Sequence, residues 1–146
     1  MKQQGCALCD TVGGALVFQS AKFRVIRAAE AGFPAFYRLI WTDHVAEFSE
    51  LAPADRHLCM ETTVQVEQLL RKHLKPAKVN LASLGNVVAH LHWHIIARFE
   101  WDSHFPAPVW AAAQREAPAG ELARVESLLP ALETEMTLLL AGACAA

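Results

Sequence analysis

Short apolar runs with a two-residue alternation occupy the first third of the chain and return after residue 77. The early runs are ALVFQ at 15–19, KFRVIRA at 22–28 and PAFYRLIW at 34–41. Runs of this kind, rich in β-branched and aromatic residues, predict β-strands. KVNLAS at 78–83 and HLHWHIIAR at 90–98 continue the pattern, so we expect an antiparallel sheet of about five strands.

Helical periodicity fills the gap between these strands and reappears near the C-terminus. From about Pro53 to Leu74 the apolar residues fall near one face, and Pro76 follows as a stop signal. A later stripe predicts a second helix that starts near Pro130, with apolar positions at Leu132, Met136, Leu139 and Leu140. The region from Glu100 to Gly120 is rich in Pro, Ala and Trp and is expected to be irregular.

These elements predict an α+β fold, in which one long helix and a C-terminal helix pack with the antiparallel sheet. We expect one domain over residues 1–146, with an N-terminal segment at 1–14 and a C-terminal helical segment at 120–146. The length of 146 residues and the 53% of hydrophobic residues suit a single globular core.

Charge and composition narrow the class of protein. The net charge is −2, which gives no basic surface for nucleic acid and no polybasic patch for a membrane. The N-terminal MKQQGCALCD lacks the apolar run of a signal peptide, and MTLLLAGACAA is shorter than the roughly 20 residues that span a bilayer. We therefore expect a soluble cytoplasmic protein that binds neither nucleic acid nor a membrane.

The chain contains four cysteines, of which two are close in sequence. Cys59 and Cys144 are interpreted as small hydrophobic residues, because free cysteine usually behaves as one. Cys6 and Cys9 form a C-x-x-C pair, a spacing found at metal and redox sites.

The strongest chemical signal is the alternation of His90, His92 and His94. In a strand these side chains share one face with Ile96 and Arg98, at intervals of about 6–7 Å. Leu91, Trp93, Ile95, Ala97 and Phe99 form the opposite face, which is apolar, so Trp93 is interpreted as core packing.

The spacing of the three imidazoles leaves two interpretations open. Several of them could bind one metal ion, or one could act as a nucleophile toward phosphorus while its neighbours hold phosphate oxygens. Gly85 and Asn86 form a predicted turn just before the strand, and such a turn can present backbone N–H groups to an anion. The turn favours the phosphate interpretation.

The segment HLHWHII matches the His-x-His-x-His-x-x pattern, with apolar x, of the histidine triad (HIT) family. The resemblance extends over most of the chain, including the order of strands and helix and the stretch RLIWTDHVAEFSEL before the helix. Family members are nucleotide hydrolases and transferases, commonly dimers whose sheets join. The zinc-containing, bacterial-type branch resembling dinucleoside polyphosphate hydrolases fits this sequence best.

The resemblance implies a role for each matching residue. His92, the middle histidine, would attack the α-phosphorus to form a nucleotidyl-histidine that water hydrolyses, and His94 would hydrogen-bond phosphate or leaving-group oxygens. Asn86 and Asn80 correspond to polar contacts with the phosphate chain. Gly85 and Arg98 are further candidates for phosphate binding, because one frees backbone N–H groups and the other can form paired hydrogen bonds.

The resemblance also implies a structural zinc. In part of the family, a C-x-x-C pair, a histidine before the long helix and the first triad histidine bind it. The corresponding residues are Cys6, Cys9, His44 and His90. This assignment gives His90 to the metal and leaves His92 for the reaction.

Two features depart from the family pattern. The stretch Val87-Val88-Ala89 lacks the hydroxyl that members often carry as a phosphate contact. The residues Arg27–Glu30 lack the Asp or Asn that often holds the ribose, and only Glu30 could substitute for it.

We expect a nucleotide hydrolase acting on dinucleoside polyphosphates, with nucleoside phosphoramidates as the alternative substrate class and a homodimer as the assembly. Two other classes stay open. One is a zinc hydrolase that uses His90, His92 and His94 as ligands of a catalytic metal. The other is a nucleotide-binding module without turnover, which the missing hydroxyl and ribose acid favour.

Overall fold

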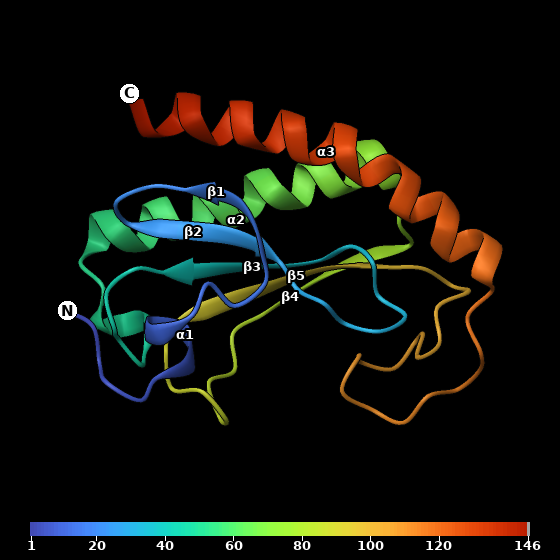
Figure 1. Ribbon diagram of the computed structural model, residues 1–146, viewed down its shortest axis with the longest axis horizontal. Coiled ribbons are helices and arrows are strands. Elements are labelled where there is room, and N and C mark those ends of the chain that lie inside the picture. The colour runs from blue at the N-terminus through green and yellow to red at the C-terminus, as the bar shows by residue number, and fades with distance from the viewer. Residues whose placement is uncertain (146) are drawn as a thin grey trace.

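The computed structural model describes residues 1–145 and contains one five-stranded antiparallel sheet (Figure 1). The order of the strands across the sheet is β1-β2-β3-β5-β4. Their bounds are β1 Ala15–Gln19, β2 Phe23–Arg27, β3 Phe36–Trp41, β4 Lys78–Ala82 and β5 His92–Arg98. The predicted α+β class, with its antiparallel sheet, long helix and C-terminal helix, is confirmed.

The helices differ greatly in length. Their bounds are α1 Ala7–Asp10, α2 Pro53–Leu74 and α3 Ala119–Ala145, and a short 3-10 turn spans Phe48–Glu50. Helix α2 has the predicted limits, since Pro53 lies in its first turn and Lys75 closes it in a left-handed conformation just before Pro76.

The two long helices cover one face of the sheet, and α1 lies on the other side together with long connecting segments (Figure 1). The helix side holds the larger core, which contains Tyr37, Leu39 and Ile95 from the sheet and Leu70 and Met136 from the helices. Trp93 packs against this core, as predicted from the alternation. The opposite face holds a smaller apolar cluster that includes Leu8, Phe36 and Ile96.

The start of the last helix is a correction to the sequence prediction. Helix α3 begins at Ala119, not near Pro130, and Pro130 lies inside it. The buried positions Val125 and Leu129 continue the apolar stripe before the proline, while Pro130 itself is exposed. Packing of one continuous stripe therefore outweighs the local cost of a missing N–H donor. The side chain of Cys144 lies outside the described part of the chain.

The triad strand is also shorter than predicted. Strand β5 begins at His92, and His90 and Leu91 lie in the segment that leads into it. Leu91 still bonds to neighbouring backbone, since its N–H donates to the carbonyl of Val45 and its carbonyl accepts from Trp41. His90 is therefore fixed beside the sheet, although it is not a residue of the strand.

A buried ion pair fixes the irregular segment that follows β5. The Arg98 guanidinium donates to both carboxylate oxygens of Asp102, with Nε–Oδ2 at 2.8 Å and Nη2–Oδ1 at 3.0 Å. Asp102 also accepts backbone N–H groups from Phe99, His104 and Phe105. Both side chains are almost fully buried, so the pair pins the start of the segment against the sheet.

No helix in residues 1–145 is both long and apolar enough to cross a bilayer.

Candidate functional site

A pocket of about 410 Å³ opens on the sheet face opposite the long helices. Strand β5 contributes His92 and His94, and β3 places Arg38 directly beside His94 in the register of the two strands. The remaining wall comes from loops and from Leu8 of α1, and the lining residues are Leu8, Arg38, Leu84, Gly85, Asn86, Val87, Val88, His92, His94 and Trp110.

His92 is held in one orientation by the backbone. Its Nδ1 atom lies 2.6 Å from the carbonyl oxygen of His90. Because a carbonyl only accepts, Nδ1 carries the proton and the lone pair of the neutral ring lies on Nε2. Burial lowers the pKa of His92, the nearby charge of Arg38 also lowers it, and the bond to His90 opposes them. The site thus presents an unprotonated ring nitrogen.

In His94 the ring proton lies on the other nitrogen, Nε2, compared with His92. Arg38 Nε, which can only donate, lies 3.4 Å from His94 Nδ1, so the proton of the neutral ring is on Nε2. Burial lowers the pKa of His94 to about 3, and His92 and Arg38 add to the effect. The rings of His92 and His94 lie 4.8 Å apart between centroids. A lone pair and an N–H donor are therefore presented next to each other.

The predicted Gly85-Asn86 turn lies at the rim of this pocket. Gly85 has a φ of +83°, a left-handed conformation that glycine adopts without strain. The turn brings the Asn86 amide and the apolar side chains of Val87 and Val88 to the pocket wall. The structure thus brings Gly85 and Asn86 together with the two histidines, as the sequence predicted.

Arg98 and Asn80 lie elsewhere. Arg98 shares the face of the triad but lies at the far end of β5, where Asp102 holds it and its Nη1 donates to Asn80 Oδ1 at 2.8 Å. Neither residue lines the pocket of the two histidines. Their observed contacts support the attachment of the segment after β5, and Asp102, which the sequence analysis did not single out, is the centre of that network.

Arg38 is the charged side chain among the lining residues of this pocket, and the sequence did not reveal it as a site residue. Its Nη2 donates to Glu30 Oε1 at 3.0 Å, so the carboxylate proposed for the ribose holds the guanidinium beside His94. Arg38 is next to Tyr37 and Leu39, which face the larger core, and alternation therefore assigns it to the face of the triad. The alternation along β3 could therefore have placed Arg38 on the face of the triad before the structure was known.

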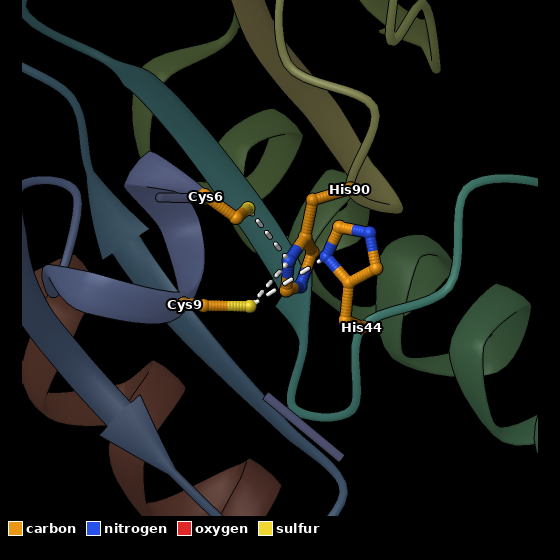
Figure 2. Close-up of side chains that lie close together, drawn as sticks. All are labelled: Cys6, Cys9, His44 and His90. Carbon is orange, nitrogen blue, oxygen red and sulfur yellow. Dashed lines mark hydrogen bonds between the residues drawn. The ribbon is translucent and has the colours of Figure 1, made fainter. Parts of the chain in front are cut away.

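A second cluster lies next to the pocket and contains Cys6, Cys9, His44 and His90. Figure 2 shows the two sulfurs pointing toward the two imidazoles, with the cysteines at α1 and the histidines on connecting segments. The four candidate ligand atoms lie within 4.8 Å of one another. The structure therefore brings together the four residues that the resemblance indicated.

The separations within this cluster fit a tetrahedral ion. Cys6 Sγ and Cys9 Sγ lie 3.5 and 3.4 Å from His90 Nδ1, and Cys9 Sγ lies 3.6 Å from His44 Nδ1. Sulfur and nitrogen ligands of a tetrahedral zinc are roughly 3.6 Å apart, given the usual bond lengths. The group could thus hold a metal ion, and its donor set and spacing are consistent with zinc.

Hydrogen bonds from the surrounding residues orient the cluster. His90 Nε2 donates to the carbonyl oxygen of Trp41 at 2.7 Å, which leaves the Nδ1 lone pair facing the sulfurs. Arg24 of β2 fixes the cysteine segment by donating to the carbonyls of Leu8, Thr11 and Val12. The cluster is therefore preorganised for binding, with His90 1% exposed.

The two clusters divide the three histidines of the triad. His90 faces the cysteines, whereas His92 and His94 line the pocket, and the metal-capable groups found in the described residues include neither of them. The fold and site thus define an α+β protein with an unprotonated imidazole nitrogen, an adjacent N–H donor and a separate Cys₂His₂ group. An arrangement of this kind suits group transfer at phosphorus.

Comparison with known families gives the same class. The family model of the HIT domain matches residues 12–101, which is more than half of the chain. The chain belongs to the HIT family, whose members are generally nucleotide hydrolases or transferases. No curated protein matches the sequence.

Solved structures of HIT proteins share the fold. A histidine triad protein from Sinorhizobium meliloti is 28% identical with a TM-score of 0.68, and the match covers 85% of this chain and 90% of that one. One from Bradyrhizobium japonicum is 29% identical with a TM-score of 0.66, covering 82% and 90%. A third, from Marinobacter aquaeolei, is 22% identical with a TM-score of 0.71, covering 94% and 99%, and supports the fold alone.

Proposed function

We propose that this protein hydrolyses nucleotides at the α-phosphate through a nucleotidyl intermediate on His92, and that dinucleoside polyphosphates are its substrates. The observation that carries the proposal is the hydrogen bond of His92 Nδ1 to the His90 carbonyl, which leaves Nε2 free to attack. The pocket beside it is large enough for part of a nucleotide, and Asn86 and His94 offer hydrogen-bond donors to phosphate oxygens.

In the first step, the lone pair of His92 Nε2 forms a bond to the α-phosphorus, and the bond from that phosphorus to the leaving group breaks. The leaving group takes the bonding electron pair, and the His90 carbonyl stabilises the positive charge that develops on the His92 ring. Water then attacks the phosphorus, the N–P electron pair returns to Nε2, and a proton passes to solvent. The product is a nucleoside monophosphate.

The state of His94 favours a polyphosphate over a phosphoramidate substrate. A polyphosphate departs as a stable anion and needs only a hydrogen bond, which the Nε2–H of His94 can supply. An amine must be protonated as it leaves, and a histidine whose pKa is lowered to about 3 holds no extra proton near neutral pH. Phosphoramidates are thus the second candidate class.

We also propose a structural zinc on Cys6, Cys9, His44 and His90. The ion would fix the N-terminal segment to the residues just before β5, while the chain's own His92 and His94 act on the substrate. A cytoplasmic location is part of this proposal, because a reducing compartment keeps thiols available for a metal.

A homodimer joined through β4 is the proposed assembly. Strand β4 is an edge of the sheet and can pair with a second copy. The other edge, β1, is partly covered by α3, whose Thr137 hydroxyl donates to the carbonyl of Val17. Light scattering should give the mass of two chains, and a monomer at micromolar concentration would contradict this assembly.

The decisive experiment is a single-turnover reaction with a diadenosine polyphosphate, quenched in base because N–P bonds hydrolyse in acid, and read by intact mass. Wild type should carry a transient adenylyl group that is absent from His92→Ala. His57→Ala, at an exposed histidine on α2, is the matched control and should form the adduct.

Other outcomes would identify the alternatives. Turnover without an adduct, lost when zinc is removed, would indicate a metal-bound hydroxide mechanism. Binding of the nucleotide without any turnover that depends on His92 would indicate a non-catalytic module.

A further inference from the structure

The pocket of His92 and His94 has an uneven distribution of charge. Of its ten lining residues, all in the described part of the chain, Arg38 is the one that carries a permanent charge. The others are apolar side chains, the Gly85 backbone, one amide and two imidazoles, none of which carries a permanent charge. A nucleotide phosphate brings negative charge into this space, and its binding requires compensation.

The Gly85-Asn86 turn provides little of that compensation. Its following residues, Val87 and Val88, line the pocket with methyl groups, and the stretch up to His90 contains no hydroxyl. The Asn86 amide is neutral. The charge that an anion needs must therefore come from the opposite wall, where β3 runs beside β5.

Arg38 is placed to supply it. Its Nε contacts His94 Nδ1 at 3.4 Å, so the guanidinium lies at the Nδ1 side of the ring. The Nε2–H of His94 is on the other side of the ring. Its Nη2 is held by Glu30 at 3.0 Å, and its hydrogen bonds within the described residues use only these two nitrogens, which leaves Nη1 for a ligand. The side chain is 23% exposed, so it is reachable from the pocket yet fixed in position.

Arg38 also lies close to both pocket histidines. It is the direct partner of His94 across β3 and β5, and it lines the same pocket as His92, whose ring centroid lies 4.8 Å from that of His94. A phosphoryl group in contact with these rings would therefore lie within the electric field of the guanidinium. A guanidinium can bind two phosphate oxygens at once, which a lysine cannot match in geometry.

We infer that Arg38, oriented by Glu30, is the residue that recognises the phosphate charge of the nucleotide in this pocket. The inference rests on the proposed function in placing a nucleotide there. It assigns to Arg38 a preference for phosphorylated over neutral ligands, and it gives Glu30 the task of holding the guanidinium rather than the ribose.

The test compares adenosine monophosphate with adenosine, which differ only in the phosphate, by calorimetric titration of the full chain. Wild type should bind the monophosphate more tightly. Arg38→Gln should weaken binding of the monophosphate by about tenfold or more while changing that of adenosine by less than about twofold, the loss expected for a charge-assisted contact. Arg38→Lys should recover part of the preference.

Arg124→Gln is the matched control, because it removes the same charge from an exposed i, i+3 pair with Glu121 on α3. It should keep the wild-type preference. Equal losses for both ligands in Arg38→Gln would mean a structural role, and an unchanged preference would mean that another group binds the phosphate; either result overturns the inference while leaving the proposed function standing. A wild type that binds both ligands equally would contradict both.

Discussion

The Nδ1 atom of His92 donates to the backbone carbonyl of His90, the residue whose ring faces Cys6 and Cys9. The proposed nucleophile is therefore oriented by the same residue that belongs to the metal-capable group. Any displacement of His90 moves the carbonyl that sets the proton position on His92. The two clusters have different side chains, but both depend on the position of the His90 backbone.

Loss of the metal group should therefore affect both stability and reaction. We expect Cys6→Ser to lower the bound zinc from about one ion per chain to a small fraction, because a hydroxyl is a poor replacement for a thiolate ligand. The melting temperature should fall, and the adenylyl adduct should form more slowly. Elemental analysis, thermal unfolding and intact mass measure these effects.

Cys59→Ala is the control for this prediction. Cys59 is buried in the larger core, away from the cluster, so the variant should retain full zinc content even though its packing is changed. Equal zinc content in Cys6→Ser and Cys59→Ala would contradict the assigned ligand set.

Acid should destabilise the protein through His94. The folded pKa of about 3 lies below the value of about 6.5 in an unfolded chain, so between these values the unfolded state binds a proton that the folded state does not. The stability of the fold relative to the unfolded chain therefore falls as the pH drops below about 6.5, because the unfolded chain gains a proton on His94. A variant without His94 lacks this pH-dependent loss.

The prediction concerns the change in unfolding free energy between about pH 7.5 and pH 5.5, measured in urea. His94→Gln should lose about 1 kcal/mol less than wild type over this interval. His94 is not a member of the Cys₂His₂ group, so any pH dependence of that group should be the same in both proteins and cancel in the comparison. The same loss in the two proteins would show that His94 is not buried as a neutral ring.

Removal of one partner from the Arg98–Asp102 pair should be costly. Asp102→Ala leaves a buried guanidinium without its carboxylate and three backbone N–H groups without their acceptor. We expect a loss of about 3–5 kcal/mol in the free energy of unfolding, measured by urea denaturation.

The exposed pair of Arg124 and Glu121 offers the comparison for that experiment. Glu121→Ala should cost less than about 1 kcal/mol, as is usual for surface ion pairs. A small effect of Asp102→Ala would mean that the segment after β5 is held by other contacts.

Trp110 should contribute to nucleotide binding. Its ring lies 5.2 Å from that of His94 and is 52% exposed at the pocket edge, which suits stacking on a base. Trp110→Ala should weaken binding of adenosine monophosphate by about tenfold, and Trp110→Phe by less, as measured by calorimetry. Trp101→Phe, at a ring that stacks on Phe99, should leave the affinity near wild type.

The sequence predicted the sheet, the limits of α2 and the side of β5 that carries the histidines, because each follows from a strong local period. It missed the first turns of α3, since Pro130 reads locally as a helix start. Only tertiary packing shows that Val125 and Leu129 extend the same stripe. The rule that a proline marks a helix start therefore failed here, because burial of one continuous apolar face determines where α3 begins.

The pocket was predictable only in part. The alternation placed His92 and His94 together, and the glycine turn placed Asn86 near them, but the role of Arg38 depends on pairing between β3 and β5. Such pairing joins residues more than fifty positions apart, so no local sequence pattern shows which residue lies beside His94. The four residues of the metal-capable group came from a family resemblance for the same reason, since Cys6 and His90 meet only in the fold.

The segment after β5 is closed at its base as well as pinned at its start. Arg115 donates to the carbonyls of Asp102 and Phe105, and the N–H groups of Gln114 and Arg115 both reach the carbonyl of Ser103. The part of the segment that carries Trp110 is thus anchored at both ends by contacts that do not involve Trp110 itself. Natural or engineered variation there can reshape what the pocket accepts without loosening the sheet, so new specificities are accessible at little risk to folding.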